Sequence, residues 1–120
     1  MKNNLIQQKT FDFAISIIKL SRQLKQKQEY ILANQLLRSG TSIGANIEEA
    51  IGGASTRDFL FRLIIANKEA RETNYWLKLI QADDPDYNLE SYIKEINDII
   101  NIISKIIITT KRNIQAKNHF

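Results

Sequence analysis

Between residues 89 and 107, large apolar side chains recur at alternating intervals of four and three residues. The positions are Leu89, Ile93, Ile96, Ile100, Ile103 and Ile107. This spacing is the heptad seam of a helix that packs against other helices, because residues three and four apart share one helical face. The strand-like run IIITT (106–110) keeps the same phase, and the chain has 21 isoleucines and no valine, so isoleucine content does not by itself indicate strands. The periodicity predicts a helix from about residue 87 to 113.

The stretch RSGTSIGANIEEA (38–50) has the composition of a loop but the spacing of a helix. It continues one stripe of apolar and small residues: Leu32, Leu36, Gly40, Ile43, Ile47 and Ala50. These positions fall within about 80° of one another on a helical wheel. We therefore predict a helix that tolerates Gly40 and Gly44 at a cost of about 1 kcal/mol each. In return, the two glycines let a neighbouring backbone approach closely.

Two more helical stripes complete the pattern. Their members are Ile6, Phe13, Ile17, Leu20 and Leu24, and then Phe59, Leu63, Ala66, Ala70, Thr73 and Leu77. Gly52-Gly53 and the DDPD stretch (83–86) break the pattern, and Ser55 or Thr56 is a plausible N-cap. The sequence predicts one all-α domain over residues 1–120, an antiparallel up-down-up-down four-helix bundle. Its helices are expected at roughly 5–25, 29–52, 56–82 and 87–113, with a basic tail over 114–120.

Further large apolar side chains lie outside these stripes. In the third and fourth predicted helices they are Phe61, Ile65, Trp76, Leu79, Tyr92, Ile99 and Ile106. Aligned apolar side chains outside a core indicate an interface. We expect a homo-oligomer built largely through these two helices. The alternative is a wider core that takes up the same residues as boundary positions.

Two stretches, QLLRSGTSIGANIEEA (35–50) and STRDFLFRLIIANKEARETNYWL (55–77), carry a family resemblance. They resemble the bacterial four-helix bundle proteins encoded in ribosomal-RNA intervening sequences, which usually have proline where this chain has Gly44. The resemblance implies a bundle that assembles into a ring, commonly a pentamer. The chain is also similar to the accessory protein of diversity-generating retroelements, a basic pentamer that binds nucleic acid and works beside a reverse transcriptase. For the intervening-sequence branch, no activity is firmly established.

Side chains suited to catalysis or metal binding are scarce. The chain has no cysteine, and its one histidine, His119, stands next to the last residue. Glu69 and Glu72 have the spacing of a di-iron bundle ligand pair but lack its histidine, so we expect them in ion pairs. We predict no enzymatic activity, no cofactor and no metal site. The lack of cysteine, of a signal peptide and of a membrane-length apolar run favours a cytoplasmic protein without membrane association.

Basic side chains are the best remaining candidates for a binding site. The chain has 17 Lys/Arg and 13 Asp/Glu, a net charge of +4. The candidates for phosphate contacts are Lys19, Arg22, Lys25, Lys27, Arg38, Arg57 and Arg62. A pentamer would carry about +20 (5 × 4), so assembly would strengthen attraction to RNA or DNA.

Two functions stay open on this basis. The first is a non-enzymatic, oligomeric accessory protein that binds RNA or DNA phosphates electrostatically, with a reverse transcriptase as a possible protein partner. The alternative is a homo-oligomeric structural adaptor that recruits a protein partner. A surplus of positive charge that serves only solubility is the simplest competing explanation of the basic residues.

Overall fold

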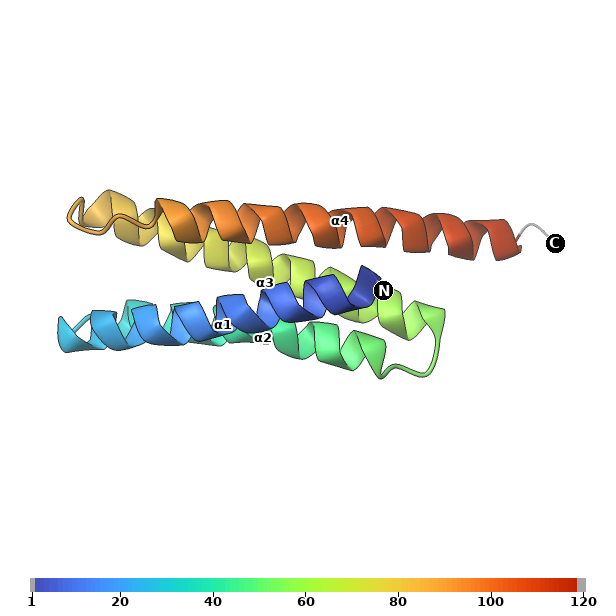
Figure 1. Cartoon of the computed structure of the whole chain (residues 1–120), viewed down its shortest axis with the longest axis horizontal. Helices are drawn as coiled ribbons and strands as arrows, with labels where there is room; N and C mark the ends of the chain where they lie inside the picture. Colours follow the sequence, from blue (N-terminus) through green and yellow to red (C-terminus); the bar gives the residue numbers. More distant parts are fainter. Residues whose placement is uncertain (1, 119–120) are drawn as a thin grey trace.

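Four helices make up the part of the chain that the computed structural model describes, residues 2–118. They are α1 (Lys2–Gln26), α2 (Tyr30–Ile51), α3 (Thr56–Asp83) and α4 (Glu90–Asn118) (Figure 1). No strand occurs between residues 2 and 118, which confirms the predicted all-α class. The helices lie along a molecule that measures 58 × 23 × 22 Å. The α1–α2 and α3–α4 connections lie at one end of it, and the α2–α3 connection lies at the other (Figure 1).

Helix α2 runs without interruption through both of its internal glycines. A Cβ built on Gly40 would lie 2.7 Å from the Cγ2 atom of Ile17, so α1 and α2 pack closely at this point. A Cβ on Gly44 would lie 3.4 Å from the hydroxyl of Thr10 and 3.5 Å from its carbonyl oxygen. The predicted close approach of a neighbouring backbone is therefore made at Gly44, whereas Gly40 accommodates a side chain.

The connections between helices are closed by local hydrogen bonds. Ser55 caps α3, and its hydroxyl accepts from the backbone N–H of Asp58 at 3.1 Å. Gln28 has a φ of 65° and turns the chain from α1 into α2. Before α4, the Gln81 side chain accepts from the backbone N–H of Leu89 at 2.7 Å. Each bond satisfies a backbone donor that the helices leave unpaired.

Most residues of the predicted stripes form the core, and Leu32, Phe59 and Ile93 are half-buried at its edge. Ile17, Leu36, Ile43, Ala70 and Ile103 are completely buried, one or two from each helix. Helix α2 packs against α1 and α3, whereas α4 packs mainly against α3 and touches α1 over a shorter stretch. Figure 1 shows α4 farther from α1 near the α3–α4 connection than near the N-terminus, and extending past the α2–α3 connection.

Two predictions about α4 are wrong. The expected basic tail is helical as far as Asn118, because Thr110 and Ile114 continue the apolar phase beyond Ile107; residues 119–120, including His119, lie outside the described residues. Ile99, predicted in a subunit interface, is completely buried beside Ile100 within the single chain. The buried face of α4 is wider than one heptad seam and takes in both side chains.

Candidate nucleic-acid interface and subunit contacts

Four of the predicted phosphate contacts gather near the C-terminal end of α1. Lys19, Arg22 and Lys27 are exposed, and Lys25 is half-buried. Among residues 5–117, no carboxylate forms an ion pair with any of the four. The Lys27 ammonium lies 4.5 Å from the centroid of the Tyr87 ring, a cation–π contact that holds the end of α1 against the α3–α4 connection. We call these four residues the α1 basic cluster.

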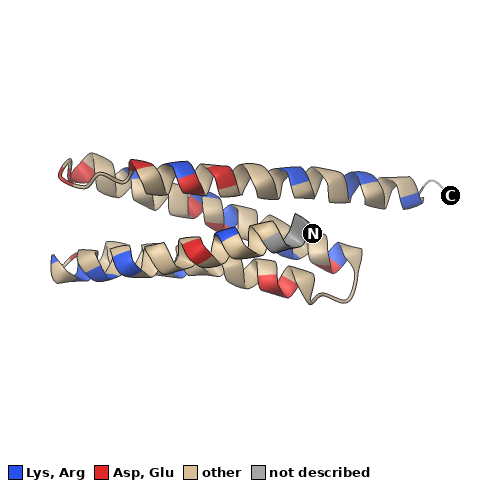
Figure 2. Ribbon diagram, viewed as in Figure 1, with Lys and Arg blue, Asp and Glu red and all other residues tan. Residues whose placement is uncertain are grey.

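The α3–α4 connection at the same end of the molecule is acidic. Asp83 ends α3, and Asp84 and Asp86 follow it in the connection; Figure 2 shows red at this connection and mainly blue at the end of α1. A polyanion approaching this end is therefore attracted to the α1 side and repelled from the α3–α4 side.

Arg38 is not part of the cluster. Its guanidinium donates to Glu69 at 3.1 and 3.2 Å and also pairs with Glu72. Glu72 in turn accepts from the indole N–H of Trp76 at 3.0 Å. Arg38 thus links α2 to α3, and two carboxylates already occupy the guanidinium that was predicted to contact phosphate.

The remaining two candidates lie at the other end of the molecule. Arg62 pairs with Glu49 at 2.8 Å and lies 5.7 Å from the centroid of the Phe61 ring. Arg57 is exposed in the first turn of α3. The seven predicted phosphate contacts therefore form one cluster of four and three separate positions.

A second basic region was not chosen from the sequence. The chain has no acidic residue after Asp98, and the C-terminal half of α4 is blue without red in Figure 2. Its exposed cations are Lys105, Lys111, Arg112 and Lys117. The lack of acids here was visible in the sequence as the expected basic tail, but its cations were not counted among the phosphate contacts.

The predicted interface residues differ in how far they are exposed to solvent. Phe61 and Leu79 are 57% and 38% exposed. Ile65, Trp76, Tyr92 and Ile106 are half-buried, and Ile99 is buried. Two exposed residues of α3 escaped prediction, Ile64 and Tyr75, at 37% and 58%. They continue the spacing of Phe61 and Leu79 along the outer side of the helix.

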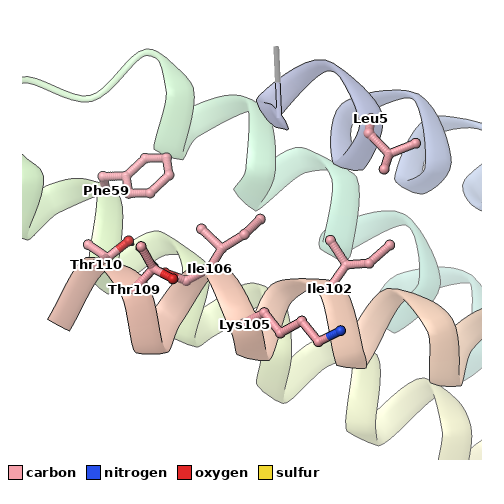
Figure 3. Close-up of a pocket in the computed structure, with 7 residues that line it drawn as sticks. All are labelled: Leu5, Phe59, Ile102, Lys105, Ile106, Thr109 and Thr110. Carbon is pink, nitrogen blue, oxygen red and sulfur yellow. Dashed lines mark hydrogen bonds between the residues drawn. The ribbon is translucent and has the colours of Figure 1, made fainter. Parts of the chain in front are cut away.

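The seam between α1 and α4 is hollow. At one end, Leu5, Phe59, Ile102 and Ile106 line a largely apolar space of about 450 Å³. Figure 3 shows Ile102 and Ile106 pointing from α4 toward α1, with Phe59 at one end of the space. Two further hollows along the same seam, of about 350 and 480 Å³, share Tyr92 as a wall.

Within the described chain, no group of three His, Cys, Asp or Glu side chains is arranged to hold a metal ion. None of the helices over residues 2–118 combines the length and the apolarity that a bilayer crossing requires.

The sequence pattern of the 23S rRNA-intervening sequence proteins matches residues 2–109. The chain belongs to the 23S rRNA-intervening sequence protein family. A solved structure from Bacteroides thetaiotaomicron VPI-5482, described as a protein with unknown function from the S23 ribosomal protein family, is 40% identical and superimposes with a TM-score of 0.83. The similarity covers 89% of this chain and 98% of that one. No curated protein matches the chain.

The family match divides the two basic regions. The α1 basic cluster lies inside the residues that match the intervening-sequence proteins, and so do the α3 residues Phe61 and Tyr75. Lys111, Arg112 and Lys117 lie beyond residue 109, outside the match. The α1 basic cluster therefore lies within the matched residues, whereas three of the four exposed cations of the α4 region lie beyond them.

Proposed function

We propose that this intervening-sequence protein is a non-enzymatic accessory protein that binds RNA or DNA through the phosphate backbone. Its subunit is an up-down-up-down four-helix bundle, and the subunits form a ring, which the family resemblance suggests is a pentamer. The α1 basic cluster is the main phosphate-binding surface of each subunit.

The observation that carries the proposal is the ion-pair pattern. Arg38 and Arg62 have carboxylate partners, whereas the cluster residues have none among the described side chains. Cations without a carboxylate partner can replace the counterions of a polyanion, and among the cluster residues Lys27 also contacts the Tyr87 ring. Because five subunits would carry about +20, a modest charge on each one gives a strong attraction for the assembly.

Binding of this kind does not depend on base sequence. Contacts to phosphate oxygens fix position and carry no sequence information, and their affinity falls steeply as salt rises. We expect RNA and DNA of unrelated sequences to bind with similar affinity, and the slope of log affinity against log salt to be negative.

The test is a filter-binding titration at two salt concentrations with a triple variant, Arg22→Ala, Lys25→Ala and Lys27→Ala. It should weaken binding at least about tenfold and reduce the salt slope. The matched control is Lys111→Ala, Arg112→Ala and Lys117→Ala, which removes the same charge from α4. Equal losses in both triple variants would show that net charge, rather than the α1 basic cluster, drives binding. A parent protein that does not bind at low salt would remove the function itself.

A further inference from the structure

One hollow of the α1–α4 seam adjoins the α1 basic cluster, and we call it the tyrosine hollow. Its volume is about 480 Å³, within the range of small-ligand sites. Leu20 and Leu89, both almost completely buried, contribute apolar surface. The half-buried Tyr87 and Tyr92 also line it, and so does Lys27 of the cluster. Apolar and aromatic surface therefore lies next to the cations that we propose as phosphate contacts.

The polar side chains of the tyrosine hollow suit a flat, neutral ligand with polar edges. Gln23 and Gln26 of α1 and Asn88 of the α3–α4 connection carry carboxamides, which both donate and accept hydrogen bonds. Asp86 is the one acid among the lining residues, and it forms no ion pair with any cation of residues 5–117. A nucleobase has the matching chemistry, because its faces stack on aromatic rings and its edges carry donors and acceptors.

The charges at this end of the molecule set the direction in which a nucleotide enters. Lys19, Gln23 and Gln26 are spaced at four and three residues, so they share one face of α1. Phosphates are attracted to Lys19 and Arg22 on α1, and the acids of the α3–α4 connection repel them (Figure 2). A neutral base is not repelled by Asp86, whose carboxylate accepts hydrogen bonds from base amino groups. The phosphate therefore stays on the α1 side, and the base points toward the connection.

We infer that the tyrosine hollow receives an unpaired base, so that the protein favours single-stranded over double-stranded nucleic acid. The inference rests on the proposed function and names its class of substrate. The base stacks on Tyr92, because the Lys27 ammonium already lies over the Tyr87 ring at 4.5 Å from its centroid. Bases of a duplex are paired and stacked, and they reach such a site only when they are flipped out. Since the carboxamides match donors and acceptors alike, the contact selects single strands without selecting a sequence.

Removing bases while keeping phosphates tests the inference. The probes are a single-stranded DNA of mixed sequence, a strand of the same length made of abasic sites, and the duplex of the first strand with its complement. The parent should bind the intact strand at least about fivefold more tightly than the abasic strand, the smallest factor expected for one stacked base. The ratio should be the same at two salt concentrations, because both strands carry the same number of phosphates.

The variant Tyr92→Leu should reduce the ratio between intact and abasic strands to below about twofold, because it removes the stacking ring. Its affinity for the abasic strand and for the duplex should stay within about twofold of the parent, since neither probe places a base in the hollow. Tyr92→Phe should keep the parent's ratio, because the ring is retained and only the hydroxyl is lost. Far-UV circular dichroism checks that each variant stays helical.

The matched control is Tyr75→Leu, because Tyr75 is 58% exposed on the outer side of α3, away from the hollow. It should keep the parent's ratio. Three results would overturn the inference: a parent that binds intact and abasic strands equally, a folded Tyr92→Leu variant that keeps the ratio, or a Tyr75→Leu variant that loses it. The first needs no variant, so it decides the matter even if Tyr92→Leu unfolds. It would leave the proposed phosphate binding intact, whereas a parent that binds none of the three probes at low salt removes the function and the inference together.

Discussion

The α2–α3 seam and the α1–α4 seam of this bundle contain different kinds of side chains. Small side chains are buried between α2 and α3, and the hydroxyls of Ser39 and Thr73 lie 2.9 Å apart there. Outside them, Arg38 joins Glu69 and Glu72 across the same seam. Small buried residues let the helix backbones approach, so the hydroxyl pair is sealed from water and its bond is retained.

The α1–α4 seam has larger side chains and fewer links. Among the described residues, Lys9 and Glu95 form its one ion pair, at 3.2 Å, and both side chains are partly exposed. Tyr92, Ile102 and Ile106 are half-buried beside hollows instead of being enclosed. The difference teaches that one side of the bundle is closed by small buried residues and ion pairs, whereas the other leaves half-buried apolar side chains beside open hollows.

The largest expected effect on stability comes from replacing one apolar residue in each seam by alanine. Leu36→Ala removes a completely buried side chain of α2 and should lower the free energy of unfolding by about 2–5 kcal/mol. Ile102→Ala removes a half-buried side chain beside the apolar hollow between α1 and α4. It should lower the free energy of unfolding by less than about 1 kcal/mol, because the space beside this side chain is already open.

Urea denaturation of both variants at the same low protein concentration makes the comparison, because dilution limits any contribution from subunit association. Equal losses at Leu36 and Ile102 would contradict the distinction between a closed and an open seam.

The closed part of the fold could be predicted from the sequence because it follows helical periodicity. Ile43 and Ile103 were placed in the core from spacing alone, and both are completely buried. The width of the buried face of α4 could not be predicted in this way. A heptad pattern identifies one seam, whereas α4 packs against α3 and also contacts α1, and its buried face takes in Ile99 as well as Ile100.

The candidate site was predictable only in part, for a related reason. The α1 basic cluster is local in sequence, so its four residues lie near one another however the other helices are arranged. The partners of Arg38 are 31 and 34 residues away on another helix. Which cations are paired therefore depends on how α2 lies against α3, and no local pattern records that arrangement.

Gly40 and Gly44 allow two positions in the tightly packed α1–α2 contact to be compared. Gly40→Ala places a Cβ 2.7 Å from the branched side chain of Ile17, which cannot turn away, so overpacking should outweigh the gain in helix propensity and cost about 1 kcal/mol. Gly44→Ala meets Thr10 at 3.4 Å and beyond, which is ordinary contact, and should stabilise the protein by up to about 1 kcal/mol. Thermal unfolding of the two variants gives the sign of each change. If both changes stabilised the protein, α1 would have to shift to relieve the contact at Gly40, and if both destabilised it, Thr10 would not tolerate the added methyl group at Gly44.

The smallest expected effect is that of Arg38→Ala, which separates the role of ion pairs in the closed seam from their proposed role in binding. The Arg38 side chain is 50% exposed, so solvent screens its pairs with Glu69 and Glu72, and the loss of stability should be below about 1 kcal/mol. Trp76, the only tryptophan of the chain, donates to Glu72, and its fluorescence emission should move to longer wavelength when the arginine no longer covers the carboxylate. Nucleic-acid affinity should stay within about twofold of the parent, because this guanidinium already has carboxylate partners and displaces few counterions. Lys25→Ala is the matched single change in the α1 basic cluster and should weaken binding more. If Arg38→Ala weakened binding more than Lys25→Ala, phosphates would be competing successfully with Glu69 and Glu72, and the binding surface would have to be moved from the end of α1 to the α2–α3 seam.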